Sequence, residues 1–591
     1  MDYKIFSYLD NVVDAYKEPV SILTGLTFDH KETLKTIEFY SNNQYLSGNK
    51  DALGREKPFY NVCNYRVTVA KTATDLDVKD IKYEPESLKD SIPTMIINHE
   101  LFKYLKEINF SQALNDMGLT RPKYGGVLVK FHEDDEDVDI SVVDWKNVEV
   151  DPVDIPGGVI VETHYLQPSE LAAKRDSWEN VDEVLKEFAK MNKNKPGRIE
   201  IKEISGEMPV SFYKQCDEEN YKETEADKGT YKRCCFYIAC LKTKKFLMYH
   251  EYEKKSKYKY LAWEKVPGRG LGRGIVEDGF EAQTWTNDAM ISAKNVMDLT
   301  SKVLIQTNSK KAANSGNVIT GVNNGHIFEL EPNASMTAMN LGPSKIPEIQ
   351  NMVEMWNNQY DRTSSTYNAN TGEAPTAGTP YSQTALLNQV ANSPFEYQRE
   401  VWGIFVNEIL NDWIFGSLRK RIMKKHYLVS EFDEDDLNTI DESIRIREGN
   451  TYEKEQLLQG FVPSPMDMQR VDESVDKALS GLGKKREIEI PEDFLDVKGK
   501  ITCNITGELK NKAAMLQSLD SVFKTVVSTY NPNTGEYAAL KDPILSKIFG
   551  QIVEMSGVPF SSAQLKSPSS VSSPMQPTAD VSAVQPVPAM V

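Results

Sequence analysis

Residues 280–304 contain neither proline nor glycine, and this stretch constrains the fold more than any other part of the sequence. Its apolar residues recur every three or four positions, a spacing that predicts one amphipathic helix. At about 1.5 Å per residue, the helix is on the order of 40 Å long. The residues of its stripe are Ala282, Trp285, Ala289, Ala293, Val296, Thr300 and Val303. The pattern begins near Ile275, directly after a glycine-rich run at 268–274, and predicts a rod in the middle of the chain.

A small polar insert and a second amphipathic helix follow this rod. Residues 305–345 place a few apolar side chains between Asn-Ser-Gly and Asn-Asn-Gly turns, which favours short strands. Helical spacing returns over 346–366. One face of this second helix carries Ile346, Ile349, Val353, Trp356 and Tyr360. The predicted order is therefore helix, small β insert, helix.

A loop and a long helix come next. Residues 367–382 are rich in glycine, proline and threonine and hold Glu373 as their single charge, which predicts a mobile loop. Residues 383–425 predict a long helix that starts or kinks at the capping box 393–396. Its expected apolar face consists of Trp402, Phe405, Ile409, Trp413 and Gly416.

The part before the rod mixes helices and strands. Residues 1–120 favour short helices, whereas 123–275 favour strands with one helix at about 168–192. The clearest hairpin joins the apolar runs 234–241 and 246–252 through a lysine-rich turn. The sequence thus predicts an α+β fold with several domains.

The end of the chain is also mixed. Residues 426–506 combine helical and strand patterns, and two helices are expected at about 508–529 and 543–556. A tail at 566–591, rich in serine and proline, has the composition of a disordered segment. We predict no function for this tail.

Composition excludes several classes of protein. The 591 residues carry 69 Lys and Arg against 87 Asp and Glu, a net charge of -18, so any contact with nucleic acid must be weak or local. The six cysteines form no disulfide or zinc pattern, and we expect reduced thiols. The sequence lacks the pattern of a secretion signal and any uncharged apolar run long enough for a membrane span, so we expect a protein made in the cytosol and no membrane partner.

Patterns of catalytic and cofactor sites are missing from the sequence. The glycines at 268–274 alternate with single residues, which is not the spacing of a nucleotide-binding loop, and a flexible joint between strand and helix is the better interpretation. The seven histidines are scattered. The acidic clusters at 133–137 and 431–436 are expected to be solvated turns rather than cation sites. We predict no catalytic residue, no metal and no cofactor.

The order of these elements resembles the core of the portal proteins of tailed bacteriophages. Gly270–Gly274 followed by Gln283 and Asn287 is similar to the family's entry to the stem, and Val148–Pro152 with Glu162–Leu166 is similar to its wing. Ile37–Asn49 and Gly54–Val62 resemble most closely the portals of crAss-like phages of gut bacteria. The resemblance covers about residues 30 to 560.

The resemblance implies a non-enzymatic ring, dodecameric in that family, at one vertex of the viral capsid. Double-stranded DNA would be packaged and ejected through it. Its implied partners are the major capsid protein, the terminase motor and the tail adaptor proteins, and its implied location is the virion, after assembly in the cytoplasm of the bacterial host. The implied parts are a helical and α/β wing (1–275), two stem helices (276–304 and 346–366), a small β-containing clip (305–345), a channel loop (367–382), a long kinked helix (383–425), a mixed wing return (426–506) and a helical crown (507–565).

Site residues follow from the same resemblance. The channel loop would present Asn370, Thr371, Gly372, Glu373, Thr376 and Gly378. The stem and the contacts between subunits would use Trp285, Ala289, Val296, Val353, Trp356 and Tyr360. Lys310 and Lys311 would be basic positions of the clip, although such runs are often only solvated. Two alternatives stay open: another neck or tail component, such as an adaptor or collar, and a metal-dependent hydrolase or nuclease.

Overall fold

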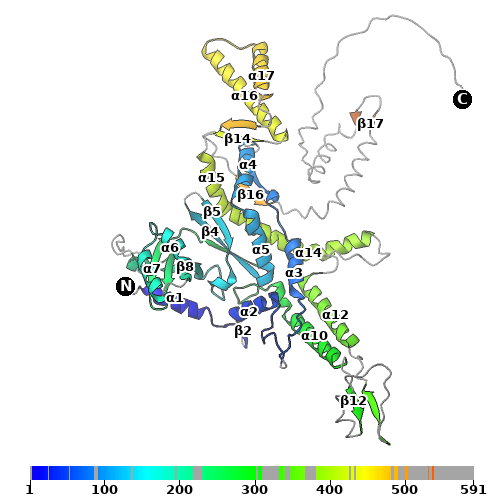
Figure 1. Cartoon of the computed structure of the whole chain (residues 1–591). Helices are drawn as coiled ribbons and strands as arrows, with labels where there is room; N and C mark the ends of the chain where they lie inside the picture. Colours follow the sequence, from blue (N-terminus) through cyan, green and yellow to red (C-terminus); the bar gives the residue numbers. More distant parts are fainter. Residues whose placement is uncertain are drawn as a thin grey trace, which may run out of the picture. The chain divides into compact units, whose positions relative to one another are not determined.

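Helices and several β-sheets are combined in the computed structural model of the chain, which confirms the predicted α+β class (Figure 1). The chain divides into two compact units: unit 1 is Met1–Leu428 with Ile488–Ile505, and unit 2 is Val429–Glu487 with Thr506–Val591. The structure describes residues 3–23, 25–51, 54–85, 91–134, 137–192, 196–216, 229–300, 304–308, 332–333, 335–339, 346–366, 381–424, 427–431, 434–480, 485–489, 499–503, 530–531 and 536–537.

Two antiparallel sheets form much of unit 1. The larger has the strand order β10-β9-β8-β7-β6, and the smaller has the order β11-β4-β5. The strands of the larger sheet are β6 (Val148–Glu149), β7 (Ile160–Leu166), β8 (Ile199–Pro209), β9 (Tyr231–Cys240) and β10 (Lys245–Tyr252). Those of the smaller sheet are β4 (Gly126–Asp134), β5 (Asp137–Val142) and β11 (Tyr258–Ala262). The β9–β10 pair confirms the predicted hairpin with its lysine-rich turn.

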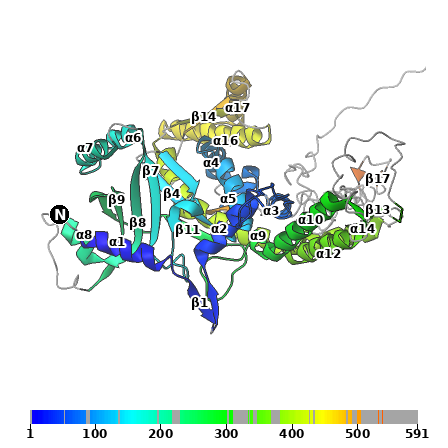
Figure 2. The same cartoon turned by 60° about the horizontal axis from the view of Figure 1, so that its bottom comes forward.

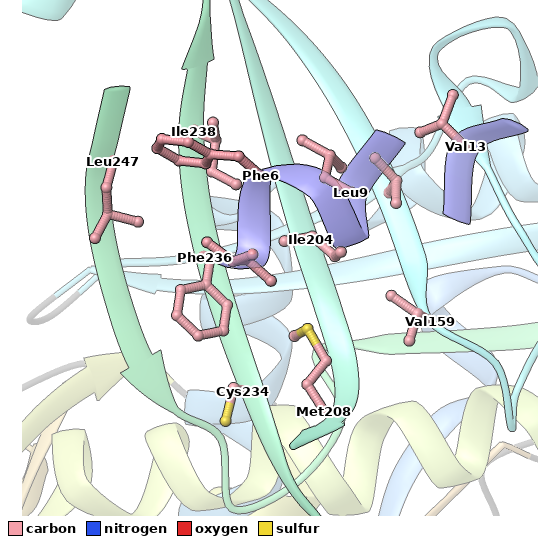
Figure 3. Packing of buried hydrophobic residues seen from close by; sticks show 12 residues of the cluster. Phe6, Leu9, Val13, Val159, Ile204, Met208, Cys234, Phe236, Ile238 and Leu247 are labelled. Carbon is pink, nitrogen blue, oxygen red and sulfur yellow. The ribbon is translucent and has the colours of Figure 1, made fainter. Parts of the chain in front are cut away.

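Both faces of the larger sheet are covered. Helix α1 (Lys4–Ala15) lies across one face, where its Phe6 and Leu9 pack against Ile204, Phe236 and Ile238 (Figure 3). The alternate side chains of β9 form a second buried cluster with α6 (Pro168–Ala173) and α7 (Val181–Asn192). Because successive strand residues point to opposite faces, β9 contributes to both clusters and reads as a continuous apolar run.

Several short elements surround these sheets. The helices are α2 (His30–Ser41), α3 (Cys63–Ala73), α4 (Ser91–Glu107), α5 (Phe110–Tyr124) and α8 (Val210–Cys216), with the 3-10 turns η1 (Val78–Asp80) and η3 (Trp145–Asn147). The additional strands are β1 (Val20–Leu23), which pairs with β2 (Leu26–Phe28), and β3 (Ile81–Pro85), which pairs with β16 (Gly499–Cys503). The β3–β16 pair brings residues more than 400 positions apart in sequence into one sheet.

The glycine-rich run at 268–274 crosses the end of α5 at backbone contact distance. A Cβ atom at Gly272 would lie 2.2 Å from the carbonyl oxygen of Gly125, and one at Gly274 would lie 2.5 Å from the Gly125 nitrogen. The guanidinium of the buried Arg269 donates to the carbonyl oxygens of Leu271 and Gly272 and also binds Glu277. The run joins strand β11 to helix α9 (Ile275–Asp278), as predicted for a joint between strand and helix. Glycine is required at Gly272 and Gly274 because two backbone segments touch there.

Two helices and a small strand pair follow this crossing. Helix α10 (Phe280–Thr300) runs beside α12 (Ile346–Ser364), and the pair leads to β12 (Leu304–Thr307), which pairs with β13 (Met336–Met339) (Figures 1 and 2). The predicted order of helix, β insert and helix is confirmed for the described residues. The first helix is not continuous from Ile275, because α9 (Ile275–Asp278) ends at Gly279, where a Cβ atom would lie 2.3 Å from the ring of Tyr360.

The long helix expected over 383–425 comprises α14 (Tyr381–Ile409), a π-helical turn η6 (Leu410–Ile414) and α15 (Phe415–Met423). It continues through Pro394. Trp402, Phe405, Ile409 and Trp413 are buried as predicted, whereas Gly416 is exposed.

Unit 2 contains a second helical hairpin, α16 (Glu434–Leu458) and α17 (Pro465–Ser480), in which Arg445 binds Asp476 at 2.6 Å. Strand β14 (Tyr427–Glu431) pairs with β15 (Lys485–Glu489), and β17 (Tyr530–Asn531) pairs with β18 (Glu536–Tyr537). Of the region predicted as one mixed block at 426–506, β16 returns to unit 1 and the two helices belong to unit 2.

Some predicted segments lie outside the described residues: the helices at 508–529 and 543–556, the tail at 566–591 and most of 305–345. Among the helices that are described, none combines the length and the apolar character that crossing a membrane requires.

Candidate functional site

The pair α10 and α12, here called the stem hairpin, is held by its two apolar stripes. The rings of Trp285 and Trp356 stack with their centroids 6.0 Å apart and an interplanar angle of 5°. Trp285 is still 49% exposed, and the buried indole nitrogen of Trp356 has no hydrogen-bond partner within the described part of the chain. The two tryptophans predicted as stem residues are thus brought together, and they leave an apolar surface uncovered.

The other predicted stem residues differ in exposure. Ala289, Val296 and Val353 are half-buried along the hairpin. Tyr360 is 2% exposed, and its hydroxyl donates to the carbonyl oxygen of Ile275 at 2.7 Å, so this side chain is committed to the core of its own chain. Large apolar side chains that remain exposed on the hairpin are Trp285, Met297, Met352 and Met355.

Polar residues at the base of α10 hold the backbone of a distant segment, Tyr60–Val62. The buried side chain of Gln283 accepts from the amide of Val62 at 3.0 Å and donates to the carbonyl oxygen of Tyr60 at 2.6 Å. Asn287, one helical turn further, accepts from the amide of Tyr60 at 3.0 Å. The resemblance to the portal stem had singled out Gln283 and Asn287. In the structure they form hydrogen bonds with backbone groups of Tyr60 and Val62, which lie outside helices and strands.

A buried ion pair anchors the base of α12. Arg66, 5% exposed, binds Asp361 at 2.6 Å, donates to the carbonyl oxygen of Val62 at 2.6 Å and lies over the ring of Tyr360. Sequence reasoning missed Arg66 and Asp361, because they are almost 300 positions apart and neither lies in a recognisable motif. The hairpin therefore stands on a rigid base.

Replacing Gln283 by leucine is expected to lower the free energy of unfolding of unit 1 by about 2–4 kcal/mol. The leucine fills nearly the same volume but leaves the Val62 amide and the Tyr60 carbonyl group without their partner, at about 1–2 kcal/mol for each group, the lower part of the usual range. Gln359→Leu on the exposed face of α12 makes the same chemical change as a control and should alter stability by less than about 0.5 kcal/mol. Urea unfolding followed by tryptophan fluorescence measures both, and equal effects would contradict the role of Gln283.

A cluster of charged side chains lies between the two sheets of unit 1. Lys130 Nζ is 2.5 Å from Glu203 and 2.9 Å from Glu162, and His164 Nε2 is 2.9 Å from Glu203. Glu203 is fully buried. Burial alone would raise the pKa of Glu203, but the hydrogen bond from His164 and the charge of Lys130 hold it well below its usual range. Burial opposes the charge of Lys130, yet Glu203 and Glu162 raise its pKa above the usual value.

This network opens into a cavity of about 480 Å³, and the oxygens of Glu162 and Glu203 converge with the His164 nitrogen as metal ligands would. The Lys130 ammonium, however, is within hydrogen-bonding distance of both carboxylates, where a metal ion would have to lie. A second such group, Cys235 with Glu251 and Glu253, likewise has the ammonium of Lys257 bonded to Glu251. In each of these two clusters a lysine ammonium is thus bonded to the carboxylates, which disfavours the binding of a metal ion there.

The remaining predicted site residues lie outside the described residues. These are Asn370, Thr371, Gly372, Glu373, Thr376 and Gly378 of the expected channel loop and the clip lysines Lys310 and Lys311. Of the acidic cluster at 133–137, Glu133 and Asp134 end β4 and Asp137 begins β5, whereas residues 135 and 136 lie outside the described residues.

No protein-family model matches the sequence, and no curated protein matches it.

Proposed function

We propose that the chain is the portal subunit of a tailed bacterial virus, one copy of a ring at a capsid vertex through which double-stranded DNA is packaged and ejected. The stem hairpin carries this proposal. Two antiparallel helices are anchored at one end by buried polar contacts and end in a strand pair at the other. Such an element suits the wall of a channel, because its base cannot tilt without breaking the bonds of Gln283 and Arg66.

The uncovered apolar surface of the hairpin supports assembly with further copies. Trp285, Met297, Met352 and Met355 are each about half exposed or more. Exposed apolar patches on a rigid element commonly mark protein interfaces. A ring requires each subunit to offer two different surfaces to its neighbours. One face of the hairpin therefore packs against another face of the next subunit.

The charge of the chain suits a conduit for DNA. DNA presents one negative charge per about 1.7 Å of helix axis, and a wall of subunits with a net charge of -18 each repels it. Repulsion keeps the duplex from adhering while it slides. In this proposal residues 305–345 meet the terminase motor and later the tail adaptors, residues 367–382 face the channel, and the major capsid protein surrounds the ring.

Purified protein is expected to form annular particles with a central hole in negative-stain images. Met355→Glu places a charge on the exposed apolar face of the hairpin and should lower the fraction of rings at a given concentration, because the charge would be buried between subunits. Tyr165→Glu alters a residue of similar exposure, 47%, on β7 and serves as the control. A wild-type protein that stays monomeric in every condition would refute the proposal.

The alternatives predict other results. An adaptor or collar would also form a ring, but it would be absent from DNA-free procapsids, where a portal must already be present. A hydrolase or nuclease would turn over nucleic acid with added Mg²⁺. Because the ammonium groups of Lys130 and Lys257 are bonded to the convergent carboxylates where a metal ion would have to lie, we expect no such turnover.

A further inference from the structure

A cavity of about 580 Å³ lies beside the β9–β10 turn of unit 1. Its apolar wall comes from Tyr3 and Phe6 at the start of the chain and from Phe246 and Leu247 on β10. Phe6 and Leu247 also belong to the core beneath α1, so this wall is fixed by the packing of the larger sheet. The cavity is thus a preformed surface feature in which one wall is apolar and the rest of the lining is mostly polar.

Lysines line the rim of this cavity. Lys245 is paired with Asp10, but Lys242 and Lys244 have no acidic partner among the described residues. Glu183 is the single carboxylate among the described lining residues. In a chain with a net charge of -18, these two lysines give the rim a local positive charge beside the apolar wall. The lysine rim and the apolar wall together favour an occupant that combines apolar side chains with negative charge. We call this cavity, with its lysine rim, the basic-rimmed cavity.

Unit 2 exposes a segment of this chemistry at the turn between α16 and α17. Five large apolar side chains within ten residues are exposed by 53 to 84%: Leu457, Leu458, Phe461, Val462 and Met466. The two helices that carry this apolar turn contain twelve Asp and Glu against five Lys and Arg. Glu453 and Glu455 directly precede the turn, with Lys454 between them.

The apolar turn is rigid. Gly460 adopts a φ of +83°, and the amide of Phe461 donates to the carbonyl oxygen of Gln456 at 2.9 Å, which closes the end of α16. Ser464 and Asp467 exchange hydrogen bonds that start α17. A backbone fixed in this way loses little conformational entropy when the turn is buried in a contact, which favours docking of the turn.

We propose that the apolar turn of one copy docks into the basic-rimmed cavity of a second copy of the chain. The two surfaces match in both apolar character and charge, and they are different surfaces of the same molecule, as a ring contact requires. This inference rests on the proposed ring, and it names one of the contacts that close it. The contact also offsets the mutual repulsion of subunits that are all strongly acidic.

Charge exchange tests the contact. We expect Lys242→Glu with Lys244→Glu to raise the concentration for half-assembly, measured by mass photometry at fixed salt, by about tenfold or more, because like charges then face each other. Glu453→Lys with Glu455→Lys should do the same. All four changes together should return this concentration to within about threefold of the wild-type value. Lys103→Glu with Lys106→Glu on the exposed face of α4 introduces the same charge and should leave assembly unchanged.

Each outcome of these measurements either supports or overturns the docking contact. Assembly that is unaffected by the lysine reversal, or that the fourfold exchange fails to restore, overturns the docking contact while the ring itself stands. Loss of DNA binding by the lysine variant, with unchanged assembly, assigns the lysines to nucleic acid and also overturns it. If the wild-type chain forms no rings, the proposed function is refuted, and the docking contact that rests on it is refuted as well. Circular dichroism melts of every variant separate lost assembly from lost folding.

Discussion

A Gly272→Ala variant is expected to lose about 3 kcal/mol or more of the stability of unit 1 and to accumulate in the insoluble fraction. The added methyl carbon would lie 2.2 Å from the carbonyl oxygen of Gly125 and 2.8 Å from both the Cβ of Ala262 and the carbonyl oxygen of Glu264. These neighbours are backbone or a short side chain, so they cannot rotate away. Overpacking usually costs about 1–3 kcal/mol, and rigid neighbours put this site at the upper end or beyond.

The same substitution at Gly416 is the matched control. Gly416 lies inside α15, and a Cβ atom there would meet nothing within 4 Å. Alanine should therefore stabilise the helix by about 0.5–1 kcal/mol, since glycine is the poorer helix former. Urea unfolding of both variants should give shifts of opposite sign. A destabilised Gly416→Ala, or a Gly272→Ala variant that unfolds like the wild type, would show that the crossing at 268–274 is loose.

The long helix shows where the spacing of apolar residues no longer predicts which residues are buried. The spacing of 3.6 residues predicted Trp402, Phe405, Ile409 and Trp413 on the buried face, and all four are buried. It also predicted Gly416, which is exposed. The π-helical turn at 410–414 adds one residue to a turn and rotates the following face, so the burial passes to Leu418 and Ile422. A local change of helix type leaves no signal in the apolar pattern.

Contacts between distant residues were also beyond the sequence. The stripes of the stem hairpin predicted two facing helices, because amphipathic spacing is a local property. Arg66 with Asp361, or Lys130 with Glu203, carry no such pattern: each charge alone is typical of a solvated position. The glycine-rich run was recognisable, yet its role depended on Gly125, which lies far away in the chain. Local order could therefore be predicted, and the anchoring of the site could not.

The second large effect is expected at Lys130. Lys130→Met retains much of the aliphatic chain but removes the ammonium that faces Glu203, which is fully buried. Removing one partner of a buried ion pair typically costs about 3–5 kcal/mol, and because His164 remains 2.9 Å from Glu203 we expect a loss of about 3 kcal/mol at pH 7. Lys130→Met combined with Glu203→Gln removes both charges and should recover a large part of the loss. The difference between the double variant and the sum of the single variants measures the coupling of the pair.

The pH dependence of stability should change sign in this variant. In the wild type the pKa of Glu203 is held well below its usual range, so its contribution to stability is complete above the pKa of the unfolded chain, about 4.3, and is lost as the pH falls below it. Without Lys130, only His164 opposes the burial of Glu203, and we expect burial to outweigh it and to raise the pKa of Glu203. The folded variant then binds the proton more readily than the unfolded chain, so its stability should increase as the pH is lowered from 7 to 5. Urea unfolding at both pH values distinguishes the two slopes; a variant whose stability is unchanged or falls over this range would mean that water or His164 compensates the charge of Glu203.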